Sequence, residues 1–216
     1  MQERSRRTRQ QVLDGAAAEF VLRGYGDATM QAVASRIGMT KGALYAHFDS
    51  KECLALELVR QFTDGWTNAG CDREPSGETA AVTLHRVTEE LARGLQHDIR
   101  VRAAVRLLAD GPEVPGVSEP LAQLRRQLTE LIREAQQEGA VVARHPAEAI
   151  ARMLLAYAWA WARTSPEADR GSQQPGVCEV VEADWNMLCD LLWIGAPEVA
   201  PPRAGRDPSD RATPVA

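Results

Sequence analysis

The sequence predicts an all-α fold, with a three-helix helix-turn-helix unit at the N-terminus and a larger helical region after it. Apolar residues recur at spacings of three and four along most of the chain, as on the buried face of a helix. We find no strong candidate for a β-strand among the remaining segments. Glycine and proline clusters separate the periodic segments, notably at residues 70–77 and 110–116.

Residues 29–48, TMQAVASRIGMTKGALYAHF, predict two short helices joined by a tight turn. Thr29 is a suitable N-cap, and Met30 and Val33 begin the apolar spacing of the first helix. Gly38 follows the last apolar position, where a residue with positive φ ends a helix at little cost. Ala34 is small enough to let the two helices cross closely, as in a helix-turn-helix.

The second short helix is the candidate for reading DNA. Thr40 can cap it, and Leu44 then faces the core. In a helix-turn-helix the second helix enters the major groove, with its first residues nearest the bases. The residues that this arrangement turns outward are Thr40, Lys41, Gly42, Tyr45 and His47.

Further DNA contacts are expected around this helix. Thr29 stands at a helix N-terminus, which attracts a phosphate, and Lys51 opens the next helix, where we expect it to hold another. Arg4, Arg6, Arg7 and Arg9 form a basic arm that either reaches phosphates and the minor groove or is a solvated terminus.

The charge distribution favours the same end of the molecule. The 216-residue chain has a net charge of −5, yet residues 1–60 hold nine Lys or Arg and seven Asp or Glu. Positive charge is therefore concentrated at the predicted DNA-binding end.

A longer pattern runs from residue 9 to residue 58. It consists of Ala16, Ala17, Phe20, Gly24, Thr29, Ala34, Gly38, Lys41, Gly42, Leu44, Tyr45, His47, Phe48, Ser50, Lys51, Glu52 and Leu54. The pattern resembles the N-terminal domain of TetR-type transcriptional repressors, and residues 38–52 are most similar to the γ-butyrolactone-receptor branch. The resemblance covers about the first quarter of the chain. It implies a homodimeric repressor on a (pseudo)palindromic double-stranded DNA operator, released by a small-molecule inducer.

The resemblance also implies a division of the chain. We expect a DNA-binding domain at 1–50 and a helical ligand-binding and dimerisation domain at 51–196. The Pro-, Ala- and charge-rich tail at 197–216 is expected to be disordered. Outside the helix-turn-helix, helices are expected at residues 6–23, 51–68, 78–96, 99–109, 119–138, 146–163 and 179–194.

An inducer is expected between the helices of the second domain. The proposed lining residues are Trp66, Leu91, Val105, Leu128, Tyr157 and Trp161, although each could equally be ordinary core or dimer packing. γ-Butyrolactone receptors usually place a tryptophan in the helix after the proline-rich loop. Residues 119–138 contain none. An antibiotic or a biosynthetic intermediate is therefore as plausible as a γ-butyrolactone-type signal.

The last two helices are apolar over more than one face, which exceeds what the surface of a monomer needs. We expect them to form a four-helix bundle across a two-fold axis. The residues expected in the dimer interface are Ala151, Leu155, Ala158, Trp185, Leu188 and Leu192.

Other classes of function are less well supported. Catalytic motifs such as G-x-S-x-G and H-E-x-x-H are absent from the sequence, so we expect no enzyme. A ligand-independent DNA-binding protein, a redox-responsive regulator and an activator of the same fold remain alternatives. The four cysteines form no C-x-x-C pair, and no His/Cys cluster has zinc spacing, so no metal or cofactor is expected.

Hydropathy bears on localisation. No apolar run approaches the roughly 18–20 residues that span a bilayer, and the basic N-terminus lacks the apolar segment of a signal peptide. We therefore expect a cytoplasmic protein without a membrane partner.

Overall fold

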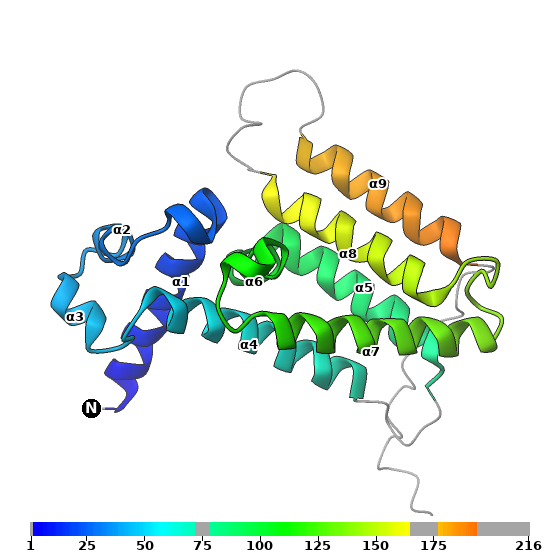
Figure 1. Cartoon of the computed structure of the whole chain (residues 1–216), viewed down its shortest axis with the longest axis horizontal. Helices are drawn as coiled ribbons and strands as arrows, with labels where there is room; N and C mark the ends of the chain where they lie inside the picture. The colour runs from blue at the N-terminus through cyan, green and yellow to red at the C-terminus, as the bar shows by residue number, and fades with distance from the viewer. Residues whose placement is uncertain (1, 72–77, 165–176, 194–216) are drawn as a thin grey trace, which may run out of the picture.

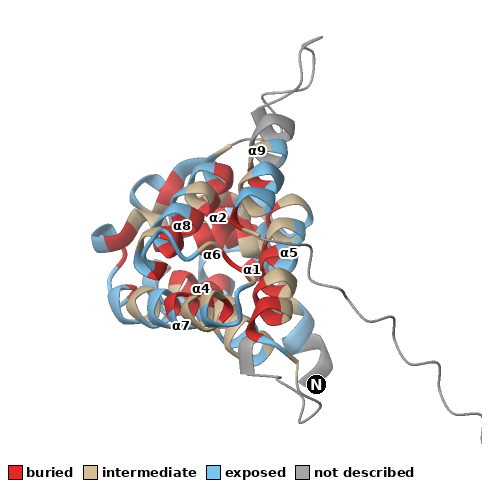
Figure 2. Cartoon of the chain, turned by 90° about the vertical axis from the view of Figure 1, so that its right-hand side faces the viewer, coloured by how far each residue is buried: buried red, intermediate tan, exposed pale blue. Residues whose placement is uncertain are grey.

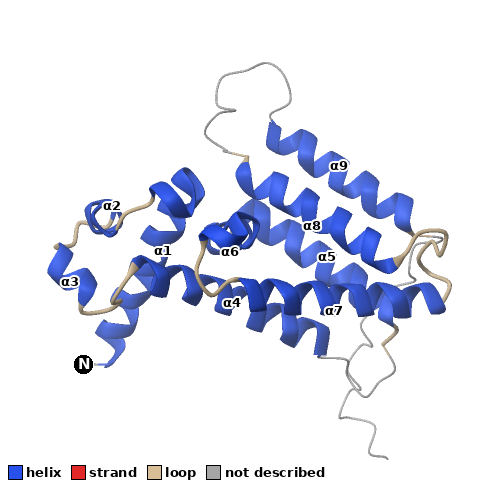
Figure 3. Cartoon of the chain, in the orientation of Figure 1, coloured by secondary structure: helices blue, strands red, loops and turns tan. Residues whose placement is uncertain are grey.

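The computed structural model describes residues 2–71, 78–164 and 177–193. The tail predicted at 197–216 lies outside these residues, as do most of the two loops predicted at 70–77 and 164–177. Within the described ranges the chain is helical, with one isolated antiparallel bridge between Val141 and Trp193 (Figure 3). The elements are α1 (Gln2–Asp27), α2 (Met30–Arg36), α3 (Lys41–Tyr45), α4 (Lys51–Cys71), α5 (Ala80–His97), α6 (Ile99–Asp110), η1 (Gly111–Glu113), α7 (Ser118–Gln137), α8 (Ala147–Arg163) and α9 (Val177–Leu192).

The all-α prediction is confirmed, and most helices begin and end within about three residues of the predicted positions. The largest difference is in α1, which starts at Gln2, so the predicted basic arm is the first two turns of a helix. The predicted end at Gly24 is a break with φ of 74°, after which one more turn runs to Asp27.

Helices α1, α2 and α3 lie together at one end of the molecule (Figure 1). Helix α4 starts at that end and runs under the body formed by α5, α7, α8 and α9, while the shorter α6 lies between the two parts (Figure 1). Their buried faces point toward a shared interior (Figure 2). Helix α4 is thus the chain segment that runs directly from the end that carries α3 into the body.

The turn between α2 and α3 has the predicted construction. The Thr29 hydroxyl accepts a hydrogen bond from Ala32 N at 3.1 Å, and the Thr40 hydroxyl accepts one from Ala43 N at 3.2 Å. Gly38 has φ of 67°, the left-handed conformation that favours glycine. Leu44 is fully buried in the core, as expected.

Gly15 is a constraint that the periodicity did not reveal. A Cβ at this position of α1 would lie under 3.0 Å from Cγ2 of Ile37, just after α2. Gly15 is buried in the middle of a helix, where glycine is otherwise unfavourable. The close approach of α1 and the end of α2 therefore explains the choice of residue.

Helix α6 is the main partner of α1. The Arg100 guanidinium bonds the Asp14 carboxylate at 2.7 Å, and it also bonds the side chain and carbonyl of Gln10. Further along, Arg106 donates to the carbonyl of Val21, and Asp110 accepts from Tyr25 N at 3.2 Å. These contacts hold α1 against α6 along most of its length.

The ends of α5 are satisfied by side chains from other helices. Both carboxylate oxygens of Glu138 accept from the first backbone amides of α5, at Ala80 N and Ala81 N. At the other end, the buried Arg102 donates twice to the carbonyl of Leu95. Free amides and carbonyls at helix ends are thereby paired, which fixes α5 against α6 and α7.

We expect Gly15→Ala to destabilise the protein by about 1–3 kcal/mol, because the added methyl overpacks the contact with Ile37. Chemical denaturation followed by circular dichroism measures the change. Gly65→Ala in α4 is the control, since a Cβ there meets nothing within 4 Å. Equal stability of both variants would contradict the tight approach of the helices.

Candidate nucleic-acid interface and ligand pocket

The residues predicted to face DNA lie on the exposed side of α2 and α3. Thr29, Thr40, Lys41 and Gly42 are exposed, and the Tyr45 ring is 40% exposed. These five residues lie at one end of the molecule, where a DNA duplex can reach them. Two of them, Thr29 and Thr40, are the N-caps of α2 and α3.

The remaining candidates are placed less uniformly. His47 is half-buried, and Arg6 and Arg7 are exposed on the first turns of α1. The side chain of Arg4 lies outside the described residues. Lys41 places its ammonium 5.7 Å from the centre of the Tyr45 ring, so these two side chains share one exposed face of α3.

Gly42 has no structural reason to be glycine. It occupies an exposed position in α3, its φ is not positive, and a Cβ there would meet nothing within 4 Å. Glycine in a helix costs about 1 kcal/mol relative to alanine. The absence of a constraint inside the chain favours an external one, such as close approach of a phosphate to the backbone.

Lys51 is half-buried at the start of α4 and contacts the end of α1. Its ammonium donates to the carbonyl of Tyr25 at 2.6 Å and to that of Gly26 at 3.1 Å. It also lies 4.3 Å from the centre of the Tyr25 ring. Lys51 therefore joins the start of α4 to the end of α1, and the predicted phosphate contact would compete with these three interactions.

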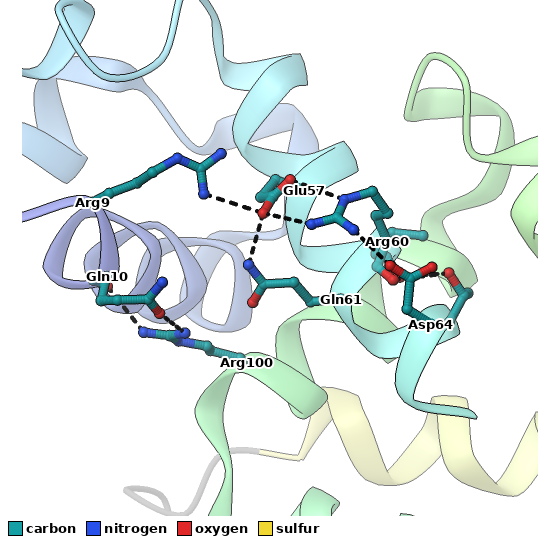
Figure 4. A network of polar contacts seen from close by, with 9 residues as sticks. Arg9, Gln10, Glu57, Arg60, Gln61, Asp64 and Arg100 are labelled. Atoms are coloured by element: carbon teal, nitrogen blue, oxygen red, sulfur yellow. Dashed lines mark hydrogen bonds and ion pairs between the residues drawn. The ribbon is translucent and has the colours of Figure 1, made fainter. Parts of the chain in front are cut away.

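Glu57 stands at the centre of a polar network between α1 and α4 (Figure 4). Its carboxylate bonds Arg60 at 3.0 and 3.1 Å, Gln61 at 2.8 Å and Arg9 of α1 at 3.1 Å. The bond from Arg60, with those from Gln61 and Arg9, lowers the pKa of Glu57 to about 2 despite its partial burial. Arg9 also covers the Phe48 ring at 4.6 Å, which links the network to the helix-turn-helix.

Glu19 forms ion pairs that join two helices of the helix-turn-helix unit. Its carboxylate is buried in α1, and it pairs with Arg36 at 2.7 Å and with Arg23 at 3.0 Å. Arg36 ends α2, so the pair fixes that helix to α1. In the sequence, Glu19 stands among apolar residues on the predicted buried side of the first helix, which indicates a buried ion pair. The apolar spacing did not identify Arg36 as the partner of Glu19.

The body contains an enclosed apolar pocket between α4, α5, α6, α7, α8 and α9. Of the predicted lining residues, Trp66, Leu91, Val105 and Leu128 do line it, together with Phe62. Its other lining residues are Thr88, Leu108, Leu124, Leu154, Leu155, Ala158, Trp159 and Trp185. The free volume is about 20 Å³, so the protein's own side chains nearly fill the pocket.

Two of the six predicted lining residues lie elsewhere. Tyr157 is half-buried and does not contribute to the wall of the pocket. Trp161 is buried against Trp185, with ring centres 6.2 Å apart, and acts as core. Helix α8 is apolar on several sides, so the spacing of its apolar residues did not show which side faces the pocket. Tyr157 and Trp161 are on other sides of the helix.

Most of the residues predicted for a dimer interface are buried within the single chain. Leu188 alone is half-buried, while five are buried within one copy: Ala151, Leu155, Ala158, Trp185 and Leu192. Leu155, Ala158 and Trp185 line the pocket. Among the described side chains of α8 and α9, the large apolar residues that are exposed are Met153 at 39%, Met187 at 55% and Leu191 at 63%.

Cys189 bears on the redox alternative. Burial, reinforced by the negative charges of Asp190 and Glu89, raises the pKa of its thiol to about 11. The thiol is therefore neutral at pH 7, while the reactive form of cysteine is the thiolate. This disfavours Cys189 as an oxidation sensor.

Two further findings concern the described part of the chain. None of its helices has the length and apolar character needed to cross a membrane. Among these residues there is also no cluster of three or more His, Cys, Asp or Glu side chains placed to hold a metal ion.

Comparison with known proteins defines the class of the N-terminal part. Residues 12–58 match the family of bacterial regulatory proteins called the tetR family, by its N-terminal domain. The HTH-type transcriptional repressor Rv1474c of Mycobacterium tuberculosis is 41% identical over 56 residues, which are 26% of this chain and 30% of that protein. The match therefore spans less than a third of that relative.

Solved structures extend the similarity to the rest of the fold. A γ-butyrolactone receptor described as an ArpA-like protein is 26% identical, with a TM-score of 0.63, over 85% of this chain and 98% of that chain. CprB from Streptomyces coelicolor, a TetR family protein solved in complex with its operator sequence, is 28% identical, with a TM-score of 0.61, over 70% and 76%. The chain thus carries a TetR-family N-terminal domain on the TetR-type all-α fold, and γ-butyrolactone receptors are among its structural neighbours. This confirms the resemblance drawn from residues 9–58.

We expect Gly42→Ala to raise stability by about 0.5–1 kcal/mol while weakening DNA binding about tenfold or more. The methyl group meets no atom of the protein, so any loss of DNA affinity must arise at the DNA surface. Thermal unfolding and fluorescence anisotropy with labelled duplex measure the two effects. Unchanged DNA affinity would show that no phosphate approaches the backbone at Gly42.

The lowered pKa of Glu57 predicts a pH dependence. A depressed pKa stabilises the folded state above the ordinary value of 4.5, and that contribution is lost as pH falls from 4.5 to about 2. We expect Glu57→Gln to lower stability at neutral pH by roughly 1–2 kcal/mol, since the exposed Arg60 limits the effect. The variant should also lose less stability across that pH range in denaturation experiments, and parallel pH curves would contradict the assignment.

Proposed function

We propose that this protein is a homodimeric transcriptional repressor that binds a (pseudo)palindromic operator and is released by a small-molecule inducer. The observation that carries the proposal is the exposed α3, capped by Thr40 and bearing a glycine that nothing inside the chain requires. The similarity to repressors and to operator-bound CprB supports the same conclusion.

The DNA contacts in this proposal fall into two groups. Thr40 and Lys41 open α3, where side chains meet base edges first, so we assign sequence preference to them. Tyr45, Thr29 and the exposed arginines Arg6 and Arg7 are suited to phosphates. Because α3 spans five residues, phosphates carry much of the affinity, and both subunits are needed for tight binding.

The apolar pocket is the proposed inducer site. The described lining residues include no charged side chain, and the Thr88 hydroxyl already donates to the carbonyls of Leu84 and His85. An apolar part of the inducer therefore fits here. The candidate classes remain a γ-butyrolactone-type signal, an antibiotic or a biosynthetic intermediate.

The contacts of α4 give the inducer a route to DNA. Phe62 and Trp66 line the pocket, while Glu57, little more than one turn earlier on the same helix, holds Arg9 of α1. A ligand that displaces the two aromatic rings would tilt α4 and change the position of α1 with its attached α2 and α3. In a dimer this changes the separation of the two recognition helices.

Dimerisation is assigned to the exposed faces of α8 and α9. Met153, Met187 and Leu191 are large apolar residues that one copy leaves in solvent. A second copy related by a two-fold axis would cover the same residues of both chains. This keeps the four-helix arrangement expected from the sequence but places different residues in it.

A second candidate is a DNA-binding regulator without an inducer. The specific observation in its favour is the free volume of about 20 Å³, which leaves no room for a ligand unless side chains move. A protein of this kind would bind the same operator, but small molecules would not release it.

The test is a gel-shift experiment with DNA from upstream of the protein's own coding region, titrated with extract of the source culture. We expect a specific shift that the extract reverses, after which fractionation identifies the inducer. A shift that no extract reverses would support the second candidate. A folded protein that gives no shift at low salt would overturn both.

A further inference from the structure

Two hollows meet at a pair of aromatic side chains on α4. An open groove between α4, α5 and α6 has a volume of about 250 Å³, and the enclosed pocket lies behind it. Phe62, Trp66 and Leu91 line both spaces, so they form the partition between them. The Phe62 and Trp66 rings are tilted at 41° with centres 6.3 Å apart. The rings are not stacked face to face.

We propose that this groove is the outer chamber of the ligand site, and that it admits an uncharged or cationic apolar molecule while rejecting anions. The proposal rests on the inducer-binding function proposed above and specifies its ligand. The outer chamber supplies the space that the enclosed pocket lacks. Together they approach the volume of about 300–1,000 Å³ that is common for small-molecule sites, once the partition moves.

The polar groups of the groove favour a ligand that donates hydrogen bonds. Glu90 presents a carboxylate that is 46% exposed, and its closest basic partner, Arg86, is 3.8 Å away. Arg86 is also held at Glu78 and at the carbonyl of Ala69, so it only weakly neutralises Glu90. No lysine or arginine is among the groove residues in the described part of the chain. A carboxylate, phosphate or sulfonate in this groove would meet the like charge of Glu90, which Arg86 at 3.8 Å offsets only in part.

Gln61 connects the groove to the DNA-binding end. It lines the groove, and its amide nitrogen donates to Glu57 at 2.8 Å, which leaves the amide oxygen as an acceptor for a ligand. Glu57 in turn holds Arg9 on α1. A ligand in the outer chamber therefore contacts the same network that fixes α1 to α4 (Figure 4).

Gly65 offers a way to close the groove without disturbing the chain. It lines the groove, and a Cβ there would meet nothing within 4 Å. Gly65→Leu therefore fills the outer chamber and also removes a glycine from a helix interior. The matched control is Asn68→Leu, an exposed position of the same helix that does not line the groove.

Two dyes with the same ring system test the proposal on the full chain without DNA. N-phenyl-1-naphthylamine is uncharged, and 1-anilinonaphthalene-8-sulfonate adds one anionic group. We expect the uncharged dye to bind at least tenfold more tightly in a fluorescence titration. Gly65→Leu should weaken its binding at least tenfold, and Asn68→Leu should leave it unchanged.

A third variant tests the charge argument. Glu90→Gln removes the negative charge at nearly constant shape, and should narrow the difference between the two dyes by threefold or more. Equal binding of the uncharged dye to the wild type and to folded Gly65→Leu would overturn the outer chamber. Anionic dye binding as tight as that of the uncharged dye would overturn the ligand class.

These outcomes are separable from those of the proposed function. A protein that shifts operator DNA but binds neither dye would overturn the groove and leave the DNA-binding role intact. A protein that binds the uncharged dye as expected but shifts no DNA would support the groove and overturn the repressor.

Discussion

The contacts that fix α1 against α4 and α6 are the constraint on which the position of the helix-turn-helix depends, and the ion pair between Arg9 and Glu57 is one of them. This ion pair joins α1, which carries the helix-turn-helix, to α4, which lines the pocket, at an N–O distance of 3.1 Å. On another side of α1, Arg100 binds Asp14 and Gln10 from α6, a helix that also lines the pocket through Val105. Helix α1 is thus held by two helices that both reach the proposed ligand. In the proposed mechanism, movement of either one would be transmitted to α2 and α3, because Glu19 pairs with Arg36 of α2 and Gly15 lets α2 approach α1 closely.

The elements that follow from local rules were predictable from the sequence. Apolar spacing located the helices, and Thr29, Thr40 and Gly38 marked the ends of α2 and α3 because caps and positive φ depend on neighbouring residues alone. The contacts between helices were not predictable in this way. The glycine at position 15 is explained by the close side chain of Ile37. The position of the Lys51 ammonium is explained by hydrogen bonds to two carbonyl groups about 25 residues earlier in the chain. Spacing along one helix contains no information about its partner.

The body of the protein shows a second limit. Helix α8 is apolar on several sides, so its sequence identified a buried helix but not which side meets the pocket, the core or a second copy. The small residues Ala151 and Ala158 pack inside because they allow neighbouring helices to approach, whereas Met153 remains in solvent. The same ambiguity placed Trp161 in the pocket and Trp185 in the interface, although Trp185 lines the pocket and Trp161 packs behind it. Four of the six predicted residues, Trp66, Leu91, Val105 and Leu128, do line this pocket.

The central claim is that two copies of α3, presented on a rigid α1 by a symmetric dimer, recognise DNA. Selection of bound duplexes from a random library, followed by sequencing, tests it most directly. The account predicts two inverted half-sites whose centres are separated by whole turns of the double helix, about 34–36 Å per turn. Enrichment of a single asymmetric site, or no enrichment over the starting library with folded protein, would contradict it.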